Sequence, residues 1–177
     1  MIRAFRVLMS VPVLLMVLSS SAWAQLPVPD VGSGRDVPGA AELPDPSLEY
    51  KILYMVGAAP KPTDVNPTLI AAGRLLNTLA AHGVPADKRK FAVMIRGGLD
   101  IILKNEAYKA RHDGQDNPNV AIIQALKKAG VEIRVCGQGV SAMKLNRADI
   151  MPEVQVDYWA LTTRVNLELR GYVILGG

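Results

Sequence analysis

The chain contains a single cysteine, Cys136, within the stretch VEIRVCGQGV. The residues before it have the composition of a strand, and Gly137 and Gln138 after it form a turn at which a helix can begin. Backbone N–H groups at the start of a helix lack partners, and the positive end of the helix dipole favours a thiolate. Arg134, two residues earlier on the same strand face, adds a cation. This spacing is typical of a nucleophilic cysteine.

The same residues allow a second interpretation, in which Cys136 is a packed core residue. Free cysteine is among the residue types most often buried, where it acts as a small apolar side chain. Arg134 would then pair with Glu132, or with an acidic residue of a partner chain. The residues alone leave both interpretations open.

A second pair of candidate residues follows the expected strand Phe91–Ile95. Arg96 and Gly97 end that strand, and a cation beside free N–H groups can bind an anion near the thiol. A plain tight turn is the alternative. Asp100 and Glu106 come shortly after, but no pattern pairs them for acid–base catalysis.

The two histidines predict no metal site. His82 falls in the last turn of a helix, where it can cap free carbonyl groups, and His112 falls in a polar stretch open to solvent. Two histidines and one cysteine this far apart are a poor set of metal ligands. The chain has neither a phosphate-binding glycine motif nor a C-x-x-C pair, so we expect no metal and no cofactor.

Residues 1–24 have the three parts of a secretory signal peptide. Two arginines come first, an apolar run over residues 7–18 follows, and Ala22-Trp23-Ala24 forms a small-x-small cleavage site. The apolar run is too short to span a membrane and contains Pro12, so a retained anchor is the less favoured alternative. We therefore predict a periplasmic or otherwise exported protein with no membrane span after cleavage.

Residues 25–49 contain five prolines and three glycines, which predicts a flexible, partly extended linker. The net charge is +4, and two of the basic residues lie in the signal. Basic runs are missing and aromatic residues make up only 5% of the chain, so we expect no nucleic-acid partner. What remains, residues 50–177, suits a single domain.

Strand and helix patterns alternate through that domain. Asn-Pro pairs and glycines mark where helices begin and end. The alternation predicts an α/β fold, with a mainly parallel five-stranded sheet between two layers of helices. The expected strands are Tyr50–Gly57, Phe91–Ile95, Val131–Cys136, Val154–Tyr158 and Tyr172–Leu175, and the expected helices cover residues 67–82, 99–104, 118–129, 141–145 and 160–170.

The third strand differs from the others because one of its faces carries Glu132, Arg134 and Cys136. A strand covered on both faces rarely has two charges on one of them. We therefore expect this strand to lie near a sheet edge, or to have that face covered by another subunit.

The frame GVEIRVCGQ, preceded by a helix ending in KKAG, resembles the DsrE/DsrF-like family of sulfur-relay proteins. Further pieces are Asp116-Asn117-Pro118-Asn119, the Met151-Pro152 turn and Arg170-Gly171-Tyr172, so the resemblance covers residues 50–177. It implies a three-layer α/β/α fold, a persulfide carried on Cys136, and assembly into trimers or hexamers. The family often has His-Gly where this chain has Arg96-Gly97.

Two hypotheses follow for the function. In the first, the protein is a periplasmic sulfur handler, at most a persulfide-type carrier or transferase. A small sulfane-sulfur compound or a partner protein would donate sulfur to Cys136, with Arg134, Gly137, Gln138, Arg96 and Gly97 around the donor. In the second, the protein is a non-enzymatic, homo-oligomeric binding or assembly module in which Cys136 is structural.

Overall fold

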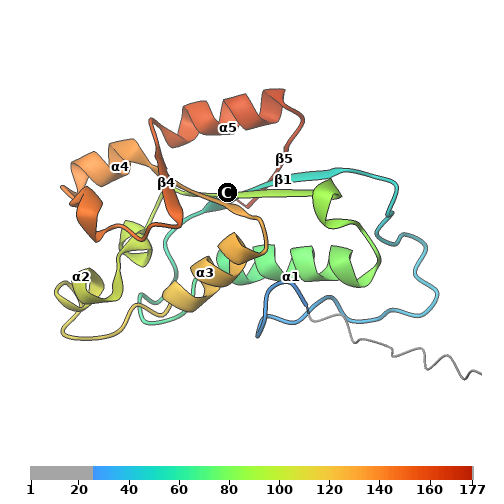
Figure 1. Ribbon diagram of the computed structural model, residues 1–177, viewed down its shortest axis with the longest axis horizontal. Coiled ribbons are helices and arrows are strands. Elements are labelled where there is room, and N and C mark those ends of the chain that lie inside the picture. Colours follow the sequence, from blue (N-terminus) through green and yellow to red (C-terminus); the bar gives the residue numbers. More distant parts are fainter. Residues whose placement is uncertain (1–25, 177) are drawn as a thin grey trace, which may run out of the picture.

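The computed structural model of the protein describes residues 26–176 (Figure 1). The expected signal peptide lies outside these residues. Five strands form one sheet in which every pairing is parallel, in the order β4-β3-β2-β1-β5. The strands are β1 (Tyr50–Val56), β2 (Arg89–Ile95), β3 (Glu132–Cys136), β4 (Val154–Asp157) and β5 (Val173–Leu175).

Helices cover both faces of the sheet, so the predicted α/β fold with its five-stranded parallel sheet is confirmed. In Figure 1, α1 and α3 lie on one side of the strands and α5 lies on the other. The α-helices are α1 (Pro67–Ala81), α2 (Asn105–Lys109), α3 (Val120–Lys128), α4 (Gly137–Ala142) and α5 (Ala160–Leu169). Short 3-10 helices occupy Ala86–Lys88, Leu99–Ile102 and Arg147–Asp149.

The two faces of the sheet have cores of different size. The larger core packs α1 and α3 against alternate strand residues such as Phe91, Val93 and Ile95. On the other face a small cluster packs α5 residues against Ala92 and Met94. The ten-residue helix α5 therefore covers most of that face. Polar side chains of β3 and β4 lie beside this helix.

The position of β3 agrees with the expectation of a strand near the sheet edge. It pairs with β2 on one side and with the edge strand β4 on the other. Its charged residues, Glu132 and Arg134, share the α5 face with Cys136, where the helix leaves a pocket.

The segment expected to be a free linker is packed against the domain over its first part, which we call the N-terminal strap (residues 26–34). Val28 is fully buried. The side chain of Asn77 on α1 accepts a hydrogen bond from the Val28 N–H (2.9 Å) and donates to the carbonyls of Val28 (2.7 Å) and Gly32 (2.8 Å). The linker interpretation is therefore wrong for the strap, because the buried Asn77 amide holds the backbone of Val28 and Gly32 against α1.

The loop before α3 also differs from the expectation. Asn117 does not cap the helix; its side chain donates to the carbonyls of Ile101 and Leu103 and accepts from the Asn119 N–H. Asn119 in turn accepts a hydrogen bond from the Asn66 N–H at 2.8 Å. These buried amides tie together the loops that follow β1 and β2, at the carboxyl edge of the sheet.

Candidate functional site

Cys136 is the last residue of β3 and the N-cap of α4. The backbone N–H of Ala160 donates to its sulfur, with an N···Sγ distance of 3.4 Å. Ala160 is the first residue of α5, so the sulfur lies at the start of two helices and accepts a hydrogen bond from one of them. Such donors favour a negative charge on sulfur.

The surroundings of Cys136 are otherwise apolar. The residue is only 7% exposed, and it packs in the small cluster with Leu53, Met55, Met94 and Leu167. A free thiol in this position can serve as a packed side chain, as the second sequence hypothesis holds. Any reagent that reaches the sulfur must be small.

Gly137 and Gln138, two of the expected ligand-binding residues, hold the end of β4 in place. A Cβ atom at Gly137 would overlap the carbonyl oxygen of Asp157. The Gln138 amide donates to the carbonyl of Tyr158 at 3.2 Å. Glycine is therefore required where α4 begins because the neighbouring strand passes too close for any side chain.

Arg134, the expected cationic neighbour of the thiol, is paired with two carboxylates. It forms ion pairs with Glu132 and with Asp157, the latter at 2.9 Å. Its side chain is 16% exposed and that of Asp157 is 8% exposed. Burial lowers the pKa of the Arg134 guanidinium, but its bonds to Glu132 and Asp157 outweigh that effect and raise the pKa above its ordinary value. Its charge is already neutralised by these partners.

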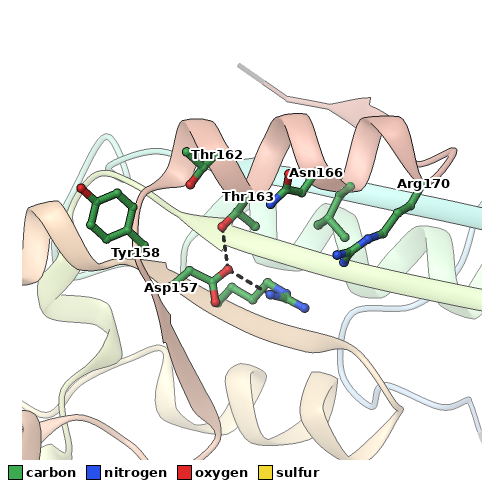
Figure 2. A pocket seen from close by; sticks show the side chains of 8 residues that line it. Asp157, Tyr158, Thr162, Thr163, Asn166 and Arg170 are labelled. Atoms are coloured by element: carbon green, nitrogen blue, oxygen red, sulfur yellow. Dashed lines mark hydrogen bonds and ion pairs between the residues drawn. The ribbon is translucent and has the colours of Figure 1, made fainter.

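Beside this ion pair lies a pocket of about 230 Å³, which we call the α5 pocket. Figure 2 shows its residues: Asp157 and Tyr158 at the end of β4, and Thr163, Asn166 and Arg170 projecting from the α5 segment. Thr163 donates a hydrogen bond to Asp157 at 2.8 Å. The sequence prediction missed Asn166 and Arg170. Their place in the pocket depends on how α5 crosses the sheet.

Arg96 directly follows β2, and its surroundings differ from those of Arg134. Its N–H donates to the Val56 carbonyl at 2.9 Å, which continues the strand ladder beyond Ile95. Ile95 pairs with Val135, and the same register continued by one residue beyond β2 would bring Arg96 beside Cys136. Its side chain is exposed and has no ion pair among the described residues.

Gly97, in contrast, forms a close contact between loops. A Cβ atom there would lie 3.1 Å from the Ala58 nitrogen, so the turn after β2 packs on the loop after β1. This matches the tight-turn alternative, and of the Arg96-Gly97 pair the arginine is exposed while the glycine is partly buried.

A charged cluster that the sequence prediction did not pair lies in the loops after β2. Asp100 accepts a hydrogen bond from Arg111 (2.9 Å) and approaches the His112 ring nitrogen (3.2 Å). The His112 ring stacks on Tyr108, with centroids 3.9 Å apart, and Tyr108 is buried. Residues 105–112 are thus fastened to the domain, and His112 is not simply solvated.

We expect Asp100→Ala to lower the free energy of unfolding by about 1 kcal/mol, because a carboxylate that is 24% exposed and has two partners contributes little more. Urea denaturation measures the loss. Asp87→Ala is the matched control, because Asp87 is exposed and unpaired among the described residues. An equal effect of the two substitutions would contradict the role of the cluster.

Among the described residues, no group of three or more histidine, cysteine, aspartate or glutamate side chains could hold a metal ion. Within the same residues, no helix has both the length and the apolar character needed to cross a membrane.

Comparisons with known proteins give a similarity in structure. No family model matches the chain, and no curated protein matches it. The structure is similar to that of a protein of unknown function, MTH1491, from Methanobacterium thermoautotrophicum, with a TM-score of 0.46 and 12% sequence identity. The similarity covers 72% of this chain and 99% of that one.

Proposed function

We propose that the protein is an exported carrier of sulfane sulfur, which it accepts on Cys136. The observation that carries this proposal is the hydrogen bond from the Ala160 N–H to the Cys136 sulfur at the start of α5. Few contacts stabilise a thiolate in an apolar cluster, and a helix N-terminus is one of them. The exposed Arg96 directly after β2, the strand beside β3, adds a cation that can attract an anionic donor.

The proposed transfer can be written with thiosulfate as the donor. The thiolate attacks the outer sulfur, the sulfur–sulfur bond of thiosulfate breaks, and sulfite leaves with its electron pair. Cys136 then carries a persulfide anion. Because the chain has one cysteine, onward transfer needs a thiol on another molecule.

Intact-mass spectrometry of the folded protein, after incubation with thiosulfate or polysulfide, tests this function. The proposal requires a mass increase of one sulfur atom that a reductant reverses. Cys136→Ser must remain unmodified under the same conditions. A wild-type protein that gains no sulfur from either donor would rule the function out.

We expect Arg96→Ala to slow sulfur loading by about threefold to tenfold at low ionic strength, because one cation near the thiol is removed. The expected difference shrinks as salt is added, since an exposed charge is screened. Arg35→Ala removes an exposed charge from residues 25–49 and is the control. Equal loading rates for the two variants would exclude Arg96 from donor capture.

Export and assembly belong to the same proposal. The signal-like residues 1–24 would direct the chain to the periplasm, where small sulfur anions are possible donors. Resemblance to the DsrE/DsrF-like family suggests a homo-oligomer, a trimer or a hexamer. A partner persulfide protein is the other possible donor or acceptor.

A second candidate function, a non-enzymatic assembly module, is favoured by the outer face of α5. Leu161, Val165 and Leu169 recur every four residues there, and with Trp159 they form what we call the α5 stripe; each is at least 42% exposed. Arg164 and Glu168 border the stripe. Two copies of α5 related by a two-fold axis could bury the stripe and bring these opposite charges together.

We expect Val165→Glu to dissociate the oligomer, because a carboxylate in an apolar contact is costly to bury. Sedimentation velocity over a range of protein concentrations measures this. Val37→Glu, at a comparably exposed position, should leave the assembly unchanged. A wild-type protein that is monomeric at every concentration would exclude this surface as a contact between copies.

A further inference from the structure

The α5 pocket has an excess of hydrogen-bond donors. The carboxylate of Asp157 is fully engaged, because Oδ2 accepts from Arg134 and Thr163 and Oδ1 accepts from Gln155 (2.6 Å). Asn166 and Arg170 are exposed residues that line the pocket, and within residues 26–176 their side chains form no hydrogen bond or ion pair. The polar groups left for a ligand are therefore the Asn166 amide, the Arg170 guanidinium and the Tyr158 hydroxyl at the rim.

The amide and the guanidinium are positioned to act together. Asn166 and Arg170 are four residues apart on α5 and its C-cap, so they are neighbours on one helix face, separated by a rise of roughly 6 Å. In Figure 2 both side chains project from the α5 segment on the side of Asp157. A guanidinium offers paired N–H groups that match the two oxygens of an oxyanion.

The charged side chains that line the pocket, Arg134, Asp157 and Arg170, have a net charge of +1, and Glu132 beside them brings the sum to zero, so the charges suit at most an anion of low charge. Arg134 is matched by Glu132 and Asp157, which leaves the guanidinium of Arg170 without an acidic partner in the described part of the chain. The pocket volume of about 230 Å³ is below the range of about 300–1,000 Å³ typical of drug-sized ligands. A small ion or a short organic acid fits these limits.

We propose that the α5 pocket binds a small molecule bearing an oxyanion group, with the oxyanion held by Arg170 and Asn166. Carboxylates, phosphate and sulfur oxyanions share this chemistry. Binding involves no bond to Cys136 and does not depend on sulfur transfer, because the ligand groups come from α5 and its C-cap.

Titration of the ¹⁵N-labelled Cys136→Ser protein with acetate, phosphate and thiosulfate, followed by NMR, tests the proposal without thiol chemistry. The side-chain N–H signals of Asn166 and Arg170 should shift saturably with at least one of these anions. The anion that saturates at the lowest concentration identifies the preferred chemistry. Absence of saturable shifts with all three would overturn the proposal.

Two variants assign the binding to this pocket. Arg170→Gln should weaken the anion roughly tenfold or more, because a charge-assisted bond is lost. Arg164→Gln, on the outer side of α5, should change the affinity by less than about twofold. Asn166→Ala should also weaken anion binding, because it removes an uncharged hydrogen-bond donor. Unchanged affinity in Arg170→Gln would overturn the proposal, even if sulfur loading of the wild-type protein succeeds.

Discussion

Gly137→Ala is expected to lower the free energy of unfolding by about 2–3 kcal/mol and to slow sulfur loading on Cys136. The added methyl group would overlap the Asp157 carbonyl oxygen, which belongs to backbone and cannot rotate away. Relief requires the end of β4 to move away from the start of α4. The start of α5 follows β4 directly, so the Ala160 N–H would shift from the sulfur as well.

Urea denaturation and the rate of sulfur loading measure the two effects of Gly137→Ala. Gly57→Ala is the matched control at the carboxyl end of β1. A Cβ atom there meets nothing within 4 Å, and Gly57 is not among the glycines with positive φ. If both substitutions changed stability by less than about 0.5 kcal/mol, the close approach of β4 to Gly137 would be contradicted.

Asn77→Leu is the second substitution with a large expected effect, a loss of about 2–4 kcal/mol. Leucine has a similar size but cannot make the three hydrogen bonds to the strap, so the Val28 N–H and carbonyl would remain buried without partners. The loss in the free energy of unfolding cannot exceed the free energy with which the strap docks. A strap that detaches forms hydrogen bonds to water instead. We therefore expect the strap to detach.

Denaturation gives the stability change of Asn77→Leu, and limited proteolysis within residues 26–34 reports detachment. Thr78→Val is the control on the same helix. It removes two exposed hydrogen bonds, from the Gly34 N–H to the threonine hydroxyl (2.7 Å) and from that hydroxyl to the Arg74 carbonyl (2.7 Å), and should cost about 1 kcal/mol. Resistance of the Asn77→Leu strap to proteolysis, at wild-type stability, would refute this role of the buried amide.

The alternation of apolar strands with helices was sufficient to predict the architecture. Five strands separated by helix-length segments require parallel pairing and helices on both faces. Strand order could not be predicted, since neighbouring strands in this sheet include β1 and β5, which are distant in the sequence. The charged face of β3 nevertheless indicated a position near the edge, because its two charges need solvent or partners.

Composition gave a wrong expectation for the N-terminal strap. Prolines and glycines are typical of linkers, but they also suit an extended segment held by side-chain bonds to its backbone. The bonds come from Asn77, some fifty residues away in the sequence, and no local pattern indicates such a contact. In the same way, Asp100 and His112 meet only because residues 105–112 fold back on the loop after β2.

The candidate site was predictable where it depends on one segment. The strand-to-helix change at Cys136 is local, and so is the Arg134–Glu132 pairing that the sequence offered as an alternative. The pairing of Cys136 with Asp157 in the sheet, and the Ala160 N–H that it brings to the sulfur, depend on the register of β3 with β4. Asn166 and Arg170 gain their role from the same packing.

The reaction of folded protein with a small alkylating reagent at about pH 6 tests most directly whether Cys136 is an accessible thiolate. Free cysteine is almost wholly protonated there and reacts slowly. With iodoacetamide followed by intact mass, the proposed function predicts modification of the native protein faster than that of free cysteine. Modification only after unfolding in denaturant would contradict it and leave Cys136 a packed core residue.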